Sequence, residues 1–251
     1  MKNRLVSAVD TDARHGAKSD KKKFVGYKVN SSMTEDGFIT NIKATPGNSY
    51  DGNVLFPLID ENIAKGQKII KVVADGAYGS ADNRYEMLKR DATLVSPVRA
   101  DKNPKGLYSQ DMFDIDETGV TCPAGNRTMI YNQNKKTGRI LYYFKKDVCE
   151  GCTLKEKCTK GNQRTVSVHK HHLLMEEAKR YNSQCEEYKD DLRIRAHIEP
   201  KQGEMKRYHG LTRAKYRGLE KVSIQSLLVG ATVNMKRFVR LSSRDYQKSL
   251  Q

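Results

Sequence analysis

The sequence has no tryptophan and lacks any apolar run near the roughly 18 residues that a membrane-spanning helix requires. Its first residues, Met1-Lys2-Asn3-Arg4-Leu5-Val6, include no apolar segment of the secretory-signal type. It also has no glycine-rich phosphate loop, no nucleophilic triad, no internal repeat and no low-complexity segment. The lack of an apolar run and of a signal segment argues against a membrane-spanning or secreted protein, and we expect a cytoplasmic protein with no membrane partner. The lack of a phosphate loop and of a triad removes two common kinds of catalytic motif.

Acidic residues are scarce relative to basic ones, with 30 Asp and Glu against 46 Lys and Arg, which gives a net charge of +16. Such an excess predicts a polyanionic partner, while the alternative is a solvated basic surface without a specific ligand. The C-terminal half mixes basic residues with Tyr208 and Tyr216, which suits a nucleic-acid backbone and predicts association with the nucleoid. The residues assigned to DNA binding are Arg195, Lys201, Lys206, Arg207, Arg213, Lys215 and Arg217.

Hydrophobic patterning predicts a mixed α/β chain. Strands over 24–30 and 38–45 form a hairpin around the turn Glu35-Asp36-Gly37. The apolar segment Lys68–Asp75 is typical of a strand buried on both faces. The other elements expected before residue 104 are a short strand at Arg4–Val9, a loop over 13–23, a helix over about 53–64 with Asp51 as its N-cap and Gly66 at its end, a helix over about 81–90, and a strand at Thr93–Val98.

The chain is expected to be helical from His169 onward. One helix covers about 171–189, a second contains Arg195, Glu199 and Lys206 and breaks near His209, and a last one covers about 221–240, with Val222, Leu227, Leu228, Val229 and Val233 buried. Changes in composition define four parts: 1–103, the first part of a core; 104–168, a Cys-rich insertion of short strands; 169–241, the C-terminal helices of the core; and 242–251, a frayed tail.

Four of the five cysteines cluster in the insertion. Cys149 and Cys152 have the spacing of a zinc knuckle, and Cys158 and Cys122 supply two further thiols. In a reducing cytoplasm this pattern favours a structural Zn²⁺ site, and the alternative is a set of reduced free cysteines. Cys185 is expected on a helix away from them, as a buried or neutral thiol.

Two acidic residues form the candidate catalytic site. Asp75 ends the strand predicted to be buried, where α/β sheets place ligands, although an Asp before Gly76 is also an ordinary turn former. Glu199 lies four residues after Arg195 and seven before Lys206, which places the three on one helix face, either as an active site or as plain surface ion pairs. Two such carboxylates can hold Mg²⁺ or Mn²⁺ ions, and a third acid is then expected on the first strand, at Asp10 or Asp12.

These residues resemble a DDE transposase of a bacterial insertion sequence over nearly the whole chain. Arg195, Glu199 and Lys206 fit the Tyr-Arg-Glu-Lys signature of that family, with Leu192 in the place of the tyrosine, and Ala74–Ser80 is similar to its second-aspartate motif. The resemblance also covers Asp10–Gly16, the cysteine insertion followed by Arg164, and the last helix with Asn234, which is typical of one branch of the family.

The resemblance implies an RNase H-like mixed sheet flanked by helices and carrying the small Cys-rich β insertion. It further implies two Mg²⁺ or Mn²⁺ ions held by Asp75 and Glu199, and strand cleavage and transfer on double-stranded DNA at transposon ends and target, by a homodimer in the DNA complex. Lys206 would contact DNA and Arg195 would support the site.

In that branch the first catalytic aspartate commonly precedes the Asp-x-Asp-Ala-Arg stretch, so either Asp10 (or Asp12) is the first acid, or the chain is an N-terminally truncated and inactive copy. The other functions considered are a structure-specific nuclease on the same fold and a non-enzymatic zinc-ribbon protein that binds nucleic acid.

Overall fold

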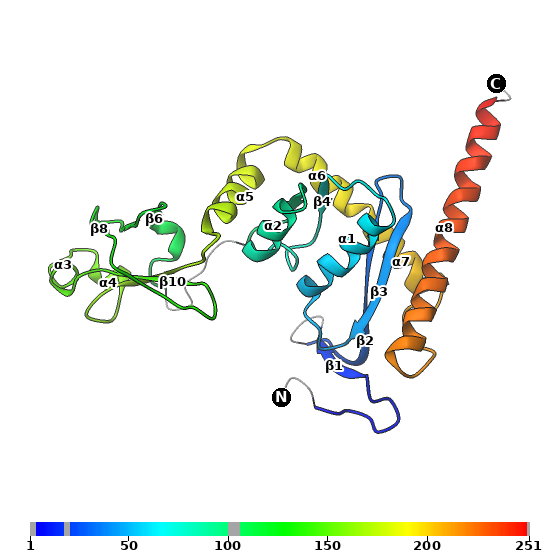
Figure 1. Cartoon of the computed structure of the whole chain (residues 1–251), viewed down its shortest axis with the longest axis horizontal. Coiled ribbons are helices and arrows are strands. Elements are labelled where there is room, and N and C mark those ends of the chain that lie inside the picture. Colours follow the sequence, from blue (N-terminus) through cyan, green and yellow to red (C-terminus); the bar gives the residue numbers. More distant parts are fainter. Residues whose placement is uncertain (1–3, 18–20, 100–105, 250–251) are drawn as a thin grey trace.

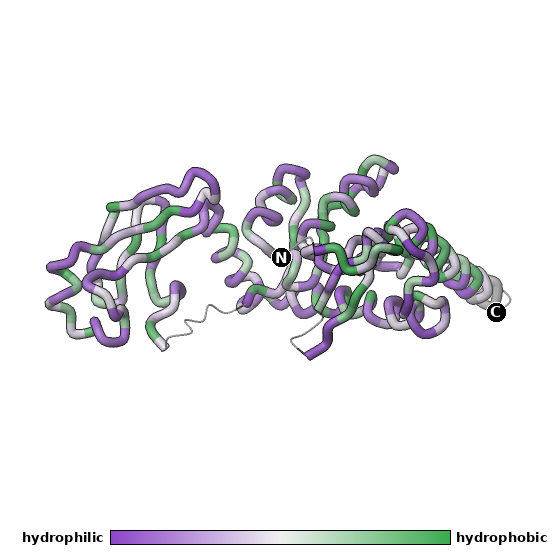
Figure 2. Tube along the Cα trace, turned by 90° about the horizontal axis from the view of Figure 1, so that it is seen from below, coloured by the Kyte–Doolittle hydropathy of each residue, from purple (hydrophilic) through white to green (hydrophobic). Residues whose placement is uncertain are grey.

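The computed structural model describes residues 4–17, 21–99 and 106–249, and shows a mixed α/β chain with several small sheets. In Figure 1 the molecule is elongated, and residues 106–168 form a lobe at one end. Figure 2 shows the same lobe set apart from the rest, with hydrophilic residues in every part of the molecule. Pro104, at which the insertion is predicted to begin, lies outside the described residues.

An antiparallel sheet in the order β1-β2-β3 forms the centre of the larger part. β2 (Lys23–Met33) and β3 (Ile39–Pro46) build the predicted hairpin. β1 (Arg14–Ala17) pairs with the first residues of β2, where a loop was expected. The strand expected at Arg4–Val9 is wrong, because this segment is irregular and pairs with no described strand.

Helices cover both faces of this sheet, with α1 (Leu55–Ala64) on one side and α8 (Leu219–Ser249) on the other (Figure 1). Asn234 of α8 fixes the start of β3, because its side chain both donates to Ile39 O and accepts from Ile39 N at 2.8 Å. The core between sheet and helix consists of Ile39, Ile42, Met205, Val229 and Val233.

The N-cap expected at Asp51 is not formed. Asp51 lies inside a short 3-10 helix, η1 (Asp51–Val54), that precedes α1, and its carboxylate pairs with Lys28 Nζ at 3.1 Å. The predicted end of the helix is confirmed, since Gly66 adopts φ +84° two residues past the end of α1.

A second, parallel pair of strands lies beside the central sheet: β4 (Lys71–Val73) and β5 (Thr93–Val95), joined through α2 (Ala81–Leu88). The expected long strand buried on both faces is wrong. Only three residues form β4, they are exposed or half-buried, and Ile70 before them is 68% exposed. Among the described strands β4 pairs with β5 alone, so its other edge gains no ladder that would extend and bury it.

The lobe has its own hydrophobic core, made of Phe113, Val120, Tyr142, Phe144, Val166 and Val168. It contains two three-stranded antiparallel sheets and the short helices α3 (Lys146–Glu150) and α4 (Lys155–Cys158). Its strands are β6 (Asp114–Ile115), β7 (Val120–Thr121), β8 (Arg127–Thr128), β9 (Tyr131–Gln133), β10 (Ile140–Tyr143) and β11 (Thr165–Val168), with the 3-10 helix η2 (Gln110–Met112) before them.

Three helices lead from the lobe back to the sheet: α5 (His172–Gln184), α6 (Glu187–Ala196) and α7 (Ile198–Tyr208). The expected helix over 171–189 is interrupted at Cys185, which is extended and exposed rather than helical and buried.

The last helix is longer than expected, because α8 continues through the predicted tail to Ser249. Val222, Val229 and Val233 are buried as predicted. Leu227 and Leu228 are not: they are 54% and 63% exposed, because only one side of α8 packs on β3.

Candidate active site

Asp75 lies two residues past the end of β4, in the loop that leads into α2. This loop is tied to β5, since Ala74 N donates to Val95 O and Ser96 Oγ donates to Asp75 O, both at 2.9 Å. Gly79 passes so close to Ser96 that an added Cβ would lie 2.5 Å from its Oγ. The backbone of Asp75 is therefore fixed, while 64% of its side chain remains exposed.

Arg195 lies in the last turn of α6, and Glu199 is the second residue of α7. The sequence predicted one continuous helix here, and the structure breaks it at His197. Pro200 is the physical reason, because it has no N–H to donate to the carbonyl of Ala196. His197 keeps right-handed helical dihedral angles (φ −64°, ψ −23°), so Arg195 and Glu199 still share one face.

The two candidate catalytic acids meet at Arg195. Its Nη1 donates to Asp75 Oδ1, and Glu199 Oε1 lies 3.7 Å from the same nitrogen. The structure thus brings together carboxylates that are far apart in the sequence and come from two different elements. Both remain accessible, with side-chain exposures of 64% and 67%. Clustered, accessible carboxylate oxygens are the ligands that Mg²⁺ and Mn²⁺ prefer.

Tyr78 connects the Asp75 loop to the central sheet, because its hydroxyl donates to Asn30 Oδ1 on β2 at 2.7 Å. Burial raises the pKa of Tyr78, and the negative charges of Asp51 and Asp75 raise it further. The phenol therefore stays protonated and keeps its donor role at neutral pH.

Asp10 and Asp12 lie at the start of α8, where each accepts a backbone N–H: Gly218 N at 3.2 Å and Leu219 N at 2.9 Å, respectively. The Tyr27 hydroxyl also donates to Asp10. Burial raises the pKa of Asp10, but these hydrogen bonds outweigh burial and lower the pKa below its ordinary value. Both carboxylates thus bind the positive end of a helix, and none of their hydrogen bonds involves Asp75 or Glu199. In the part of the chain that the structure describes, no three or more His, Cys, Asp or Glu side chains are grouped to hold a metal ion.

Asp191 is a buried residue that the sequence did not reveal as part of this region. Its side chain is 2% exposed, and it accepts from Lys71 Nζ at 2.9 Å and from the Tyr181 hydroxyl at 2.6 Å. Lys71 precedes Asp75 by four residues, and Asp191 precedes Arg195 by four. The contact therefore holds β4 against α6 directly upstream of the pair formed by Asp75 and Arg195.

Replacing Asp191 by alanine is expected to lower the free energy of unfolding by about 2–4 kcal/mol, because it leaves Lys71 and Tyr181 without a buried partner. Urea unfolding followed by circular dichroism measures this. Asp190→Ala is the matched control, since Asp190 is 68% exposed and pairs with Arg193 on the helix surface. Equal losses for the two variants would contradict the assigned role of Asp191.

Apart from Arg195 on α6, the predicted DNA-binding residues lie on α7 and on the loop between α7 and α8. Gln225, which is 7% exposed, organises this loop by donating to Gly210 O and Arg213 O and accepting from Lys215 N. Lys201 pairs with Glu204 at 3.5 Å. The exposed members of the predicted set here are Lys206, Arg207, Arg213, Lys215 and Arg217.

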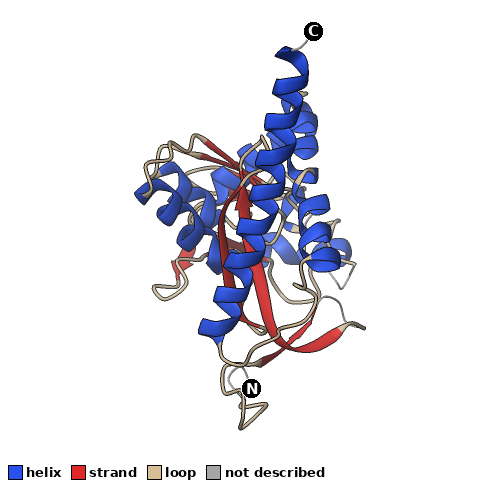
Figure 3. Ribbon diagram, turned by 90° about the vertical axis from the view of Figure 1, so that its right-hand side faces the viewer, coloured by secondary structure: helices blue, strands red, loops and turns tan. Residues whose placement is uncertain are grey.

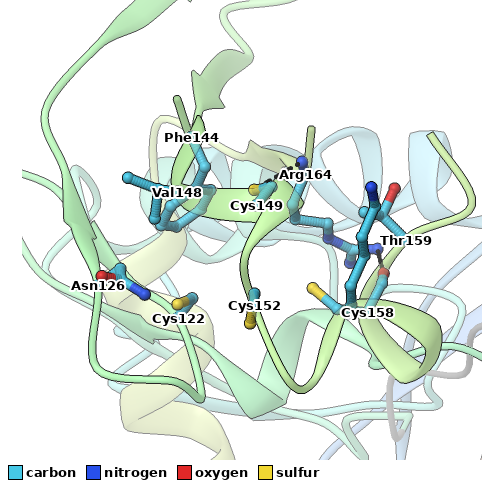
Figure 4. A pocket seen from close by; sticks show the side chains of 10 residues that line it. Cys122, Asn126, Phe144, Val148, Cys149, Cys152, Cys158, Thr159 and Arg164 are labelled. Atoms are coloured by element: carbon cyan, nitrogen blue, oxygen red, sulfur yellow. Dashed lines mark hydrogen bonds between the residues drawn. The ribbon is translucent and has the colours of Figure 1, made fainter. Parts of the chain in front are cut away.

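The four clustered cysteines line one small cavity of the lobe, of about 20 Å³ (Figure 4). They come from the β7–β8 turn (Cys122), from α3 (Cys149), from the turn after it (Cys152) and from α4 (Cys158). Burial raises the pKa of the Cys158 thiol, Arg164 opposes this, and the other three cysteines add to it. A cavity of this volume has room for about one water-sized particle.

The supporting residues left only weak signals in the sequence. Asp191 and Arg195 have the spacing of one helix face, but nothing local distinguishes a buried Asp from a solvated one. Ser96 hydrogen-bonds to Asp75, and Gln225 hydrogen-bonds to the loop before α8. These partners lie 10 or more residues away along the chain, so no local motif identifies Ser96 or Gln225.

Residues 4–235, nearly the whole chain, match the family model described as the transposase DDE domain. A search of curated proteins and a search of solved structures each found no match. No helix among the described residues is long and apolar enough to cross a membrane. Because this match covers most of the sequence, the chain belongs to the transposase DDE domain family.

Proposed function

We propose that this chain carries out metal-dependent DNA strand cleavage and transfer at transposon ends, on an RNase H-like core in which Asp75 and Glu199 are metal ligands. The single observation that carries the proposal is that both carboxylates lie against one nitrogen of Arg195. A surface-only role for these acids predicts no such meeting between residues 124 positions apart in the chain.

The residues present suit a divalent metal. Arg195 already offsets the repulsion between the two carboxylates, and a bound cation would do so more strongly. When bound, Mg²⁺ or Mn²⁺ supplies charge stabilisation and an activated water or hydroxyl for attack on a phosphodiester. Arg195 is then available for a phosphate oxygen, since its guanidinium is a bidentate donor.

The exposed cations of α7 and the following loop would hold the DNA backbone near this pair. Lys206 shares α7 with Glu199, so a phosphate bound by Lys206 lies along the same helix as the metal ligands. Arg207, Arg213, Lys215 and Arg217 extend the basic surface, and the half-buried Lys201 lies beside them on α7.

A second candidate function is a transposase-derived protein that binds metal and DNA without cleaving. The position of Asp10 and Asp12 at the start of α8 favours it, because both carboxylates are already engaged by backbone N–H groups. On this reading the two residues stabilise α8 and are not the third catalytic acid.

The deciding experiment incubates the purified chain with Mn²⁺, a DNA duplex carrying the element's terminal repeats, and a target plasmid. Joined products support the transposase, and cleaved but unjoined ends support the alternative of a structure-specific nuclease. Mn²⁺ and DNA binding without any product supports the non-cleaving candidate. If the chain neither joins nor cleaves the DNA and binds no Mn²⁺ or DNA, the assignment of the site is rejected.

We also propose a structural Zn²⁺ held by Cys122, Cys149, Cys152 and Cys158. Support comes from their shared cavity and from soft thiolate chemistry, which suits zinc. The four thiols are not grouped as a metal site in the described structure, so zinc binding would require their side chains to turn toward one centre. If zinc is not bound, the four cysteines are reduced free thiols.

A further inference from the structure

Ser96 is a buried residue that links three elements around the loop carrying Asp75. It lies directly after β5 and is 0% exposed. Its hydroxyl donates to Asp75 O at 2.9 Å, and its own carbonyl accepts from Arg84 Nη2 of α2 at 3.0 Å and from Asn182 Nδ2 of α5 at 3.2 Å. A serine hydroxyl has one proton to donate, so Ser96 commits that proton to the backbone of Asp75.

The loop lies directly on Ser96 because Gly79 has no side chain. A Cβ added at Gly79 would lie 2.5 Å from Ser96 Oγ and 2.9 Å from Ser96 Cβ. The loop is also closed internally, since Tyr78 N donates to Asp75 O at 3.0 Å. The carbonyl of Asp75 therefore has one donor from its own loop and one from the end of β5. Of these two, the hydrogen bond from Ser96 ties Asp75 to a separate element of the fold.

Helix α5 holds both strands that flank this loop. Asn182 binds the carbonyl of the residue that follows β5. The neighbouring Tyr181 donates to Asp191, which pairs with Lys71 at the start of β4. α5 is also the first helix after β11 and leads from the lobe to the rest of the molecule (Figure 1). The position of the Asp75 loop thus depends on contacts made by the helix that leaves the lobe.

We propose that Ser96 is a positioning residue for the carboxylate of Asp75, and that Asn182 makes this positioning depend on α5. This role presupposes the function proposed above, in which Asp75 is a metal ligand. The side chain of Asp75 is 64% exposed, so its own packing constrains it little and the backbone anchor at Ser96 matters more. Removing a group that supports a metal ligand commonly lowers the affinity for the metal by about 10- to 100-fold.

Titration of Mn²⁺ followed by electron paramagnetic resonance tests the role of Ser96. In Ser96→Ala, which removes the hydroxyl and adds no atom, we expect the affinity for Mn²⁺ to fall about tenfold. Ser226→Ala is the matched control, because Ser226 is also 0% exposed and its hydroxyl also donates to a backbone carbonyl, that of Val222, at 2.8 Å. Figure 3 shows α8, which carries Ser226, in front of the central sheet, whereas α2 lies beyond the opposite side of that sheet (Figure 1). The control should bind Mn²⁺ as tightly as the unaltered chain.

Hydrogen exchange gives a second readout that needs no metal. Deuterium uptake over residues 75–80, measured by mass spectrometry, should be faster in Ser96→Ala and unchanged in Ser226→Ala. Asn182→Ala should change both the Mn²⁺ affinity and this exchange in the same direction as Ser96→Ala. Its effect should be smaller, because Arg84 still holds the carbonyl of Ser96.

The possible outcomes separate the positioning role from the proposed function. If Ser96→Ala binds Mn²⁺ as tightly as the unaltered chain, or if Ser226→Ala loses as much affinity, the positioning role is overturned and the proposed function stands. An unaltered chain that binds no Mn²⁺ overturns both. An unchanged affinity in Asn182→Ala overturns the dependence on α5. Circular dichroism melting shows whether each variant is folded, and if Ser96→Ala is unfolded, the half-buried Asn182 provides the deciding variant.

Discussion

Replacing Asp75 by asparagine, or Glu199 by glutamine, is expected to reduce Mn²⁺-dependent DNA cleavage by about 10³-fold or more. Each change removes one of two carboxylates that meet at Arg195, and charge stabilisation by a bound metal is worth several kcal/mol in the transition state. The amide side chains keep the shape of the acids, so the fold should be retained. Product formation on terminal-repeat DNA measures the effect.

Metal binding provides a readout that does not depend on turnover. Titration of Mn²⁺ followed by electron paramagnetic resonance should show a binding site in the unaltered chain. The affinity of this site for Mn²⁺ should fall at least tenfold in Asp75→Asn and in Glu199→Gln. Asp190→Asn and Glu220→Gln are matched controls, since both are exposed acids on the neighbouring helices α6 and α8. If Mn²⁺ binds all five proteins equally, Asp75 and Glu199 are not the ligands.

Removing Cys149 or Cys152 is expected to abolish zinc binding and to unfold the lobe. Structural zinc sites contribute about 10–16 kcal/mol of binding free energy at neutral pH, which is far more than the small core of the lobe can replace. The short strands and the two short helices around the cavity offer few alternative contacts. Zinc content by plasma mass spectrometry should be one per chain, falling to none in Cys149→Ser and Cys152→Ser.

Cys185→Ser is the control for the zinc experiment, because Cys185 is exposed and lies outside the cavity. It should retain one zinc and an unchanged melting curve. Chelation should lower the melting temperature of the unaltered chain, and added Zn²⁺ should restore it. A chain that is purified without zinc, takes up none and melts identically with chelator would contradict the proposal.

Local patterns predicted most of the elements that carry the site. Alternation of apolar residues identified the hairpin of β2 and β3, and Gly66 marked the end of α1. The sequence also singled out Asp75 beside a strand end and the four-residue spacing of Arg195 and Glu199. Prediction from the sequence failed where the length or burial of an element depends on distant partners. β4 is short because it pairs only with β5 among the described strands. Leu227 and Leu228 stay exposed because β3 covers only one side of α8.

The sequence by itself determined the family, the basic character and the spacing of Arg195, Glu199 and Lys206, since these depend on residues near one another along the chain. The resemblance already paired Asp75 with Glu199, and tertiary structure alone decided through which contacts they meet and where the other candidate acids lie. It placed Asp75 beside Glu199 by packing α6 against β4 through Lys71 and Asp191, and it placed Asp10 and Asp12 at the start of α8. The physical reason is that a carboxylate's partner is chosen by the whole fold: Asp10 and Asp12 find free backbone N–H groups more than 200 residues away, and no local pattern encodes such a contact.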